Sequence, residues 1–204
     1  PCSTADEQIS SLPLPAATNS VAAYAGATGS GKGNLARSSK KVLVLFSGSY
    51  QRCDGIAIFL RQRGLEAELI DNDAIKGGGH ADDVLNDQRF TELYDRIRAG
   101  EFVAIFAAPP CSTYSVARFI TPRDGREGAP PVRDRMNMDG LKVVPPGHQR
   151  ELRRANKVTA RTIALLHAGA SVGAEIIMEN PADRGNEDVP HLYEEPRHGP
   201  IWLV

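Results

Sequence analysis

Cysteine and long apolar runs are scarce in this sequence. Its 204 residues include three cysteines, Cys2, Cys53 and Cys111, which lie far apart and cannot form an even set of disulfides. A reducing compartment is therefore expected. No stretch approaches the roughly 20 apolar residues of a membrane span, and the first twenty residues lack the basic start and apolar core of a secretory signal. These absences argue against a membrane protein or a secreted one, and favour an intracellular one.

The composition is that of an ordinary soluble domain, with 41% hydrophobic and 24% charged residues. The formal net charge of −1 conceals two opposite segments. Residues 64–101 hold ten acidic and four basic side chains, whereas residues 118–161 hold eleven basic and five acidic ones. A basic segment in a near-neutral chain is typical of a surface that faces phosphate groups, although a solvated helix face has the same composition.

Residues 1–40 are rich in Ala, Ser, Thr and Gly and are interpreted as a flexible leader. Within them, residues 26–33 fit the phosphate loop G-x-x-x-x-G-K, but Gly33 replaces the Ser or Thr that would hold magnesium. The sequence before this motif is weak as a strand and the sequence after it is short and polar. We therefore do not interpret the motif as a nucleotide site. The chain starts at Pro1 and ends on an apolar run, which indicates a piece of a longer protein.

From residue 41 onward, apolar runs alternate with helical periodicities. Strands are expected at 42–46, 67–70, 102–107 and 175–178, and helices at 54–63, 88–99 and 149–170. Asp54 is expected to cap the first helix. A long loop rich in Pro, Gly and Arg spans residues 121–147. The alternation predicts an α/β fold, a Rossmann-like doubly wound and mostly parallel sheet with helices on both faces.

Unusual residues follow the expected strands. They are Phe46-Ser47-Gly48, Asp71-Asn72-Asp73, Pro110-Cys111 and Glu179-Asn180, in chain order. In an open parallel sheet, ligands bind beyond the carboxyl ends of the strands, so these segments are expected to converge. A glycine turn after the first strand and a carboxylate after the second are typical of a site for an adenosine-containing cofactor. A deprotonated cysteine in a loop is a nucleophile, and a nearby glutamate can supply a proton or hydrogen bond to the same substrate.

In this order the motifs resemble those of the cytosine-5 DNA methyltransferase family, which uses S-adenosylmethionine. Residues 46–48 resemble the F-x-G turn of the family, residues 110–115 (Pro-Cys-Ser-Thr-Tyr-Ser) its P-C-x-x-x-S loop, and residues 179–180 its E-N pair. Asp71-Asn72 stands where the family has a ribose-binding acid and an adenine-stacking residue, and Asp83-Val84 resembles its motif for the adenine amino group. The resemblance spans residues 42–181 and implies the class I methyltransferase type of fold. The long insertion at 121–147 is similar to methyltransferase-like segments carried by retroelements.

The resemblance implies a role for each matching residue. Cys111 would add to carbon 6 of a cytosine flipped out of the duplex, Glu179 would bind ring nitrogen 3, and Asn180 would help to position the Cys111 loop. The implied cofactor-binding residues are Phe46, Ser47, Gly48, Asp71, Asn72, Asp83 and Pro110. The expected nucleic-acid contacts are Ser115, Arg118, Arg133 and Arg135. No metal is implied, DNA is the expected partner with RNA left open, and the expected location in a eukaryotic host is the nucleus.

The sequence also departs from the family. Tyr50 stands where the family has the second glycine of its first motif, and Asn72 offers a poor stacking surface for adenine. The arginine motif, recognition region and final helix of the family are not found before Val204. We therefore expect a catalytic, cofactor-binding domain at 41–204 that is incomplete at its C-terminus and lacks the recognition part.

A second interpretation is a methyltransferase-like module that no longer catalyses and binds nucleic acid or a protein partner. Tyr50 and the missing motifs favour it, whereas the intact Cys111 and Glu179 oppose it. A zinc deaminase would need P-C-x-x-C, but Tyr114 occupies the second cysteine position. An amino-group methyltransferase uses an Asp/Asn-Pro-Pro-aromatic loop to hold the amine, whereas residues 108–111 (Ala-Pro-Pro-Cys) keep only the two prolines. The five histidines show no metal-ligand spacing, and surface or turn roles are expected for them.

Overall fold

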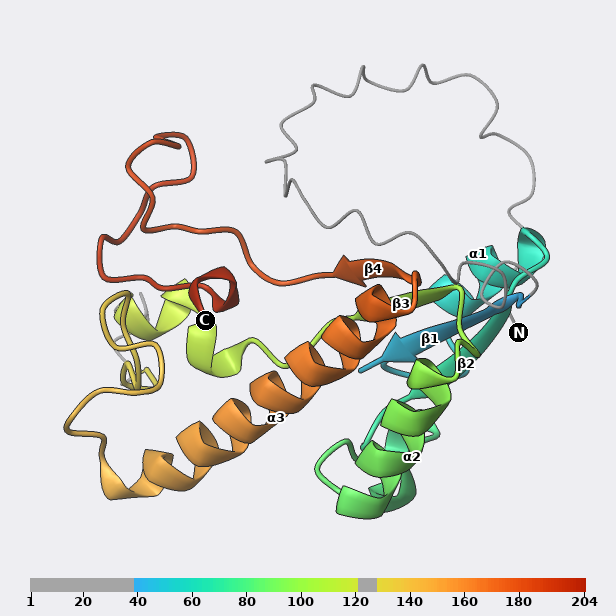
Figure 1. Ribbon diagram of the computed structural model, residues 1–204. Coiled ribbons are helices and arrows are strands. Elements are labelled where there is room, and N and C mark those ends of the chain that lie inside the picture. Colours follow the sequence, from blue (N-terminus) through green and yellow to red (C-terminus); the bar gives the residue numbers. More distant parts are fainter. Residues whose placement is uncertain (1–38, 121–127) are drawn as a thin grey trace. The chain divides into compact units, whose positions relative to one another are not determined.

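The computed structural model describes residues 39–120 and 128–204, which belong to one compact unit of the chain, Gly33–Val204 (Figure 1). Nearly all of the predicted leader, with its motif at 26–33, lies outside the described residues. Strands and helices alternate along the chain. They are β1 (Lys41–Leu45), α1 (Ile56–Gln62), β2 (Glu66–Ile70), α2 (Asp87–Arg98), β3 (Ala104–Ala107), α3 (Pro146–Ser171) and β4 (Glu175–Met178).

The four strands form one all-parallel sheet in the order β2-β1-β3-β4. Val42 of β1 pairs with Ala67 on one side and with Ala104 on the other, and Ala104 pairs in turn with Glu175. The chain moves outward from β1 to β2 and then returns to the far side of β1 for β3. The predicted α/β architecture with a parallel sheet is thus confirmed. The winding reverses between β1 and β3, which is where ligands bind in sheets of this kind.

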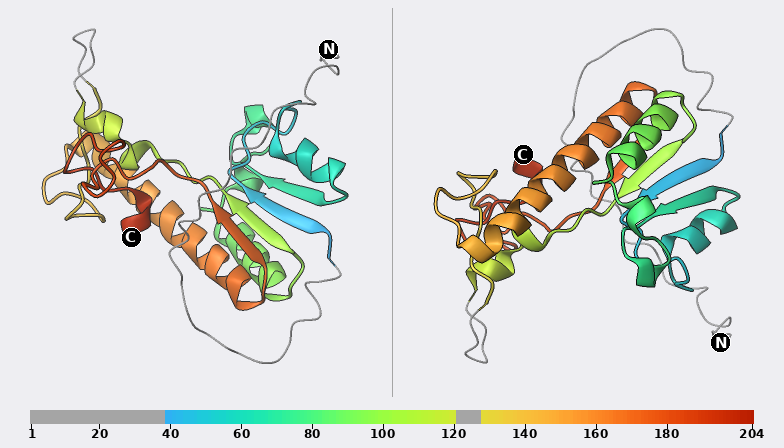
Figure 2. Two further views of the ribbon diagram at one scale, coloured as in Figure 1. Left: turned by 90° about the horizontal axis from the view of Figure 1, so that it is seen from above. Right: turned by 90° about the horizontal axis from the view of Figure 1, so that it is seen from below.

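Helices cover both faces of the sheet, with α1 on one face and α2 and α3 together on the other (Figure 2). The larger core lies beneath α2 and α3, where Leu43 and Ile105 of the strands meet Leu93 of α2 and Leu165 of α3; all four are fully buried. Val44 points to the opposite face, because strand side chains alternate, and it is also fully buried. Burial on both faces explains why β1 reads as a continuous apolar run.

Two helix starts differ from the prediction. α1 begins at Ile56 after Gly55 and has no side-chain cap, because the Asp54 carboxylate is bonded to the Arg52 guanidinium at 3.0 Å. The prediction that Asp54 caps this helix is therefore wrong. α3 begins at Pro146, three residues earlier than predicted. Proline suits the first helical position because no hydrogen bond is required of its nitrogen there.

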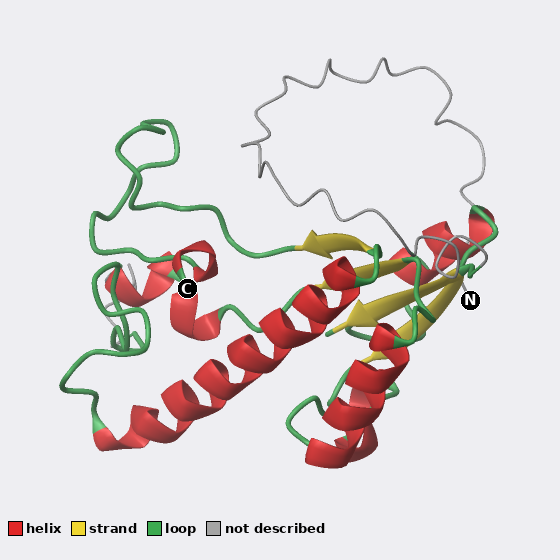
Figure 3. Cartoon of the chain, viewed as in Figure 1, coloured by secondary structure: helices red, strands yellow, loops and turns green. Residues whose placement is uncertain are grey.

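Beyond β4 the chain runs through turns to one short helix, η5 (Ile201–Leu203) (Figure 3). Residues 179–200 pack against the loop at 128–145. The Arg135 N–H donates to the Arg197 carbonyl at 2.8 Å, and a Cβ at Gly199 would lie 2.6 Å from Met138 Sδ. These two irregular segments therefore support each other in spite of having almost no regular structure.

Candidate cofactor pocket and strand-end loops

A pocket lies at the carboxyl ends of β1, β2 and β3. It is lined by Phe46, Ile70, Asp71, Asn72, Asp82, Asp83, Val84, Pro110, Arg154 and Val158. Five of the seven residues that the sequence predicts for the cofactor are in this lining, namely Phe46, Asp71, Asn72, Asp83 and Pro110. The other two, Ser47 and Gly48, form the turn after Phe46. The cavity itself is about 50 Å³, room for a few water molecules.

The turn after β1 has a strained backbone at the pocket wall. Phe46 has φ +59° and is the one non-glycine residue with positive φ in the described part of the chain. This left-handed conformation costs about 1–2 kcal/mol for an L-residue. The turn is held by two hydrogen bonds to the end of β2: Ser47 N–H donates to the Ile70 carbonyl at 3.2 Å, and Gly48 N–H donates to Asp71 Oδ2 at 2.9 Å. Strain of this kind is often found at binding sites.

Two carboxylates of the lining could serve an adenosine. Asp71 is 7% exposed, and its Oδ1 accepts the Asp73 N–H at 2.9 Å. Asp83 Oδ1 accepts the Leu85 N–H at 2.9 Å, and its Oδ2 accepts from Arg154 at 3.0 Å. Each carboxylate oxygen has two lone pairs, so both groups retain acceptor capacity for a ribose hydroxyl or an amino group. The acceptor groups of the pocket thus suit an adenosine, whose ribose hydroxyls and amino group are donors.

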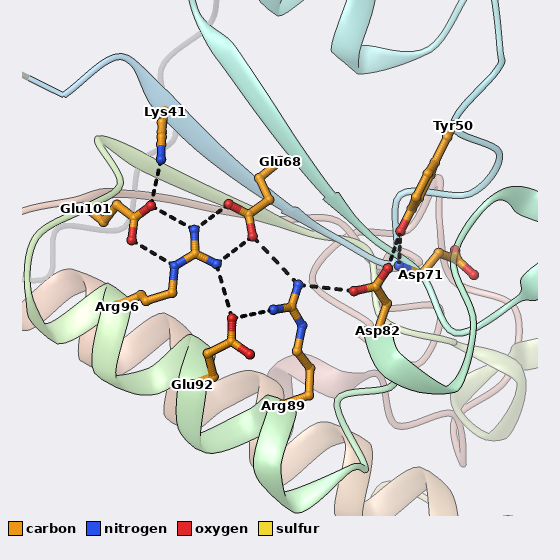
Figure 4. Close-up of polar contacts among 9 residues, drawn as sticks. All are labelled: Lys41, Tyr50, Glu68, Asp71, Asp82, Arg89, Glu92, Arg96 and Glu101. Carbon is orange, nitrogen blue, oxygen red and sulfur yellow. Dashed lines mark hydrogen bonds and ion pairs between the residues drawn. The ribbon is translucent and has the colours of Figure 1, made fainter.

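The Tyr50 side chain connects two loops of the pocket. Its hydroxyl donates to Asp82 Oδ2 at 3.1 Å and accepts the Asp71 N–H at 3.1 Å (Figure 4). The ring lies against the glycines after β2: a Cβ at Gly77 would be 2.8 Å from the ring, and one at Gly78 would be 1.7 Å from the Asp71 carbonyl oxygen. Burial, followed by the charge of Asp82, raises the pKa of Tyr50 to about 12, so the hydroxyl remains a donor at neutral pH.

Asp82 is also the end of a series of ion pairs beside β2 and α2 (Figure 4). Its members alternate in charge: Asp82, Arg89, Glu68, Arg96, Glu101 and Lys41. Arg96 binds Glu68 and Glu101 through two hydrogen bonds each, at 2.6 to 2.8 Å. The bonds from Arg96 and then from Lys41 lower the pKa of Glu101 to about 2. At the other end of the series, Asp82 Oδ1 accepts from Arg89 and Asp82 Oδ2 accepts from Tyr50.

The predicted catalytic residues follow the neighbouring strands β3 and β4. Cys111 is half-buried and begins the short helix η3 (Ser112–Tyr114), and its carbonyl accepts the Tyr114 N–H at 2.8 Å. Glu179 extends the pairing of β4, with its N–H donating to the Ala107 carbonyl at 2.9 Å and its side chain exposed. Asn180 Nδ2 donates to the Pro109 carbonyl at 3.5 Å. The structure therefore joins Asn180 to the loop that carries Cys111, and no described hydrogen bond joins Glu179 to Cys111.

Three of the four residues predicted to contact nucleic acid are partly exposed but bonded within the chain. Ser115 accepts the Ala117 N–H, and Arg135 pairs with Asp183. Arg118 donates to the carbonyls of Ser112 and Pro130 and pairs with Glu151. The Arg118 side chain is only 8% exposed and joins the Cys111 loop, through the Ser112 carbonyl, to Glu151 of α3. The polar groups of these three residues are thus bonded within the protein.

Arg133, the fourth of these residues, is 2% exposed. Its guanidinium carbon lies 3.9 Å from the centre of the Tyr114 ring, and it donates to Asn156 Oδ1 at 2.8 Å and to the Met138 carbonyl. Burial lowers the pKa of Arg133. Arg133 therefore does not lie where a phosphate group can reach it.

The sequence analysis missed a buried histidine. His198 is 1% exposed; its Nδ1 accepts the Arg184 N–H at 3.0 Å, and its Nε2 lies 2.9 Å from the Tyr114 carbonyl, to which it donates. The expectation of a surface or turn role is wrong for this residue. His198 connects the segment after β4 to the loop that starts at Cys111.

Comparison of the chain with protein-family models, with curated proteins and with solved structures gives no match. Among residues 39–120 and 128–204, no helix has the length and apolar character needed to cross a bilayer. The same residues contain no group of three or more His, Cys, Asp or Glu side chains arranged to hold a metal ion.

Proposed function

We propose that this chain is the cofactor-binding part of an enzyme that transfers a methyl group from S-adenosylmethionine to carbon 5 of cytosine in DNA. The observation that carries the proposal is the convergence of Phe46, Asp71, Asn72, Asp83 and Pro110 on one pocket at the reversal of the sheet. These residues are up to 64 positions apart, and they were selected from the sequence alone. The proposal includes the class I methyltransferase type for the α/β fold.

The residues of the pocket fit the adenosine part of the cofactor. Asp71 would accept the ribose hydroxyls, Asp83 would accept the adenine amino group, and Phe46 and Pro110 would flank the ring. The cavity of about 50 Å³ is smaller than a nucleoside, so side chains at its mouth must move when the ligand enters. When bound, the cofactor supplies an electrophilic methyl group on a sulfonium.

The strand-end loops would then act on a cytosine taken out of the base stack. The Cys111 thiolate forms a bond to carbon 6, and Glu179 donates a hydrogen bond or proton to nitrogen 3, where negative charge would otherwise develop. Carbon 5 would take the methyl group and leave the sulfonium sulfur as a neutral thioether; a base would then remove the proton from carbon 5, and the bond to Cys111 would break. Asn180 holds the Cys111 loop through the Pro109 carbonyl.

The alternative is a module with this fold that binds nucleic acid or a protein without catalysis. Tyr50 favours it, because this large side chain stands where the family has glycine and its ring packs against Gly77 after β2. RNA in place of DNA is a variant of the main proposal, because no described residue selects between the two sugars.

The test is calorimetry of the full chain with S-adenosylmethionine, followed by mass spectrometry of 5-methylcytosine in a cytosine-containing duplex. We expect binding by the wild type, and transfer that falls to background in Cys111→Ala with cofactor affinity unchanged. Cys53→Ala is the matched control, since Cys53 is exposed and away from the pocket. A folded chain that binds no cofactor supports the inert module, and transfer at the wild-type rate by Cys111→Ala overturns the proposed nucleophile.

A further inference from the structure

Four basic residues of α3 form a stripe along one side of the helix. Arg150, Arg153, Arg154 and Lys157 follow the spacing i, i+3, i+4, i+7, which at 100° per residue keeps them within a sector of about 100° and over about 10 Å of helix. We call these four residues the basic stripe. All four are exposed. Unlike Arg118 and Arg133, they keep their charges at the surface.

Two of these four charges have no acidic partner among the described residues. Arg150 and Arg153 form no ion pair with any described residue. Arg154 pairs with Asp83 at 3.0 Å, and Lys157 lies 3.5 Å from Asp87, which also pairs with Arg161. A linear array of cations with surplus positive charge suits a linear polyanion, and the phosphodiester backbone of nucleic acid is the one that the proposed substrate provides.

Arg154 belongs to the basic stripe and to the pocket at once. It is one of the lining residues, and its guanidinium occupies Oδ2 of Asp83, the oxygen not bonded to Leu85. The Arg154 side chain is 54% exposed and that of Asp83 only 13%. An ion pair with one exposed partner contributes about 0.2–1 kcal/mol, so a phosphate group can displace it.

We propose that the basic stripe docks the phosphodiester backbone of nucleic acid, and that Arg154 then leaves Asp83 for a phosphate. Asp83 is thereby freed and the mouth of the pocket widens, so nucleic acid raises the affinity of the pocket for its adenosine ligand. By linkage, the ligand raises the affinity for nucleic acid by the same factor. The inference rests on the proposed function for the identity of the pocket ligand.

The experiment measures the Kd of S-adenosylmethionine for the full chain by calorimetry, with and without a saturating 20-base-pair DNA duplex at low salt. We expect the duplex to tighten cofactor binding by about 1.5- to 5-fold, which is the free energy of the Arg154–Asp83 pair. In Arg154→Ala, cofactor binding without duplex should already be tighter by this factor, and the duplex should add nothing.

Arg153→Ala is the matched control, because Arg153 lies in the basic stripe but not in the pocket lining. It should weaken duplex binding as much as Arg154→Ala does and retain the effect of the duplex on the cofactor.

An unchanged cofactor Kd in the presence of bound duplex overturns the inference, and so does a coupling that survives Arg154→Ala. Tighter binding of polyglutamate or anionic vesicles than of DNA overturns the choice of partner. Absence of cofactor binding under every condition refutes the proposed function instead, and duplex affinity in the Arg150→Glu and Arg153→Glu variants still tests the docking surface.

Discussion

The Tyr50 hydroxyl donates to Asp82 Oδ2 at 3.1 Å, so a residue after β1 is tied to the short helix η2 (His80–Asp82) that precedes Asp83. The same hydroxyl accepts the backbone N–H of Asp71. One side chain thus fixes the spacing of three segments around the pocket.

Removing this hydroxyl should loosen the pocket. In Tyr50→Phe the Asp71 N–H and Asp82 lose a partner, which should lower the free energy of unfolding by about 1 kcal/mol and weaken S-adenosylmethionine binding about three- to tenfold. Calorimetry and urea unfolding measure the two effects. Tyr193→Phe is the control, since the Tyr193 hydroxyl has one exposed bond of 3.4 Å to Glu187. Equal cofactor affinity in the two variants would contradict a positioning role for Tyr50.

A methyl group at Gly78 should not be tolerated. Its Cβ would lie 1.7 Å from the Asp71 carbonyl oxygen, a backbone atom, so the end of β2 must shift. Gly78→Ala should lose about 3 kcal/mol or more of stability. Gly147→Ala, in the first turn of α3, has no atom within 4 Å of the new Cβ and should be neutral or slightly stabilising. Thermal unfolding compares them, and a Gly78→Ala protein as stable as Gly147→Ala would show that the loop is placed differently.

Asn180 should affect the transfer step more than cofactor binding. Asn180→Asp keeps the shape of the side chain but removes the donor to the Pro109 carbonyl, leaving two acceptors face to face. We expect kcat to fall about tenfold or more while the cofactor Kd stays within about twofold. Asn186→Asp, in an exposed turn, is the control. A cofactor Kd that rises in parallel with the loss of kcat would place Asn180 at the cofactor instead.

Acid should weaken the ion pairs beside β2. The pKa of Glu101 is lowered from 4.5 to about 2 by Arg96 and Lys41. A depressed folded-state pKa contributes stability above pH 4.5 that is lost as the pH falls towards 2. Glu101→Gln should therefore be less stable than wild type at pH 7 and should lose less stability between pH 4.5 and 2. Urea unfolding at several pH values measures this, with the exposed Glu66→Gln as control. Parallel pH profiles of Glu101→Gln and wild type would refute the assignment.

The sheet and the pocket residues were predictable because both follow from local rules. Apolar runs such as Val42–Phe46 specify buried strands, and parallel strands bring their carboxyl ends to one edge, which is why Phe46, Asp71 and Pro110 meet. The destination of individual polar side chains was not predictable. Arg133 reads as a surface cation, but its burial depends on Tyr114 and on the Met138 carbonyl, which only the folded loops bring together.

His198 and Asp54 are two more side chains whose hydrogen-bond partners could not be predicted from the sequence. His198 is placed by Arg184 and Tyr114, partners 14 and 84 positions away. Asp54 stands at a good capping position, but Arg52 competes for its carboxylate. In both cases the sequence shows the available groups and not which pair forms.

The order of the strands in the sheet also constrains how fast the chain can fold. Val42 pairs with Ala104, and Ala104 with Glu175, so each pairing waits for a loop of more than sixty residues to close. Such non-local contacts slow folding relative to helical proteins of the same size. The pocket draws on Phe46 at one end and on Val158 at the other. The residues of β1 are therefore synthesised early, but the nascent chain cannot bind a ligand in this pocket until α3 has been made.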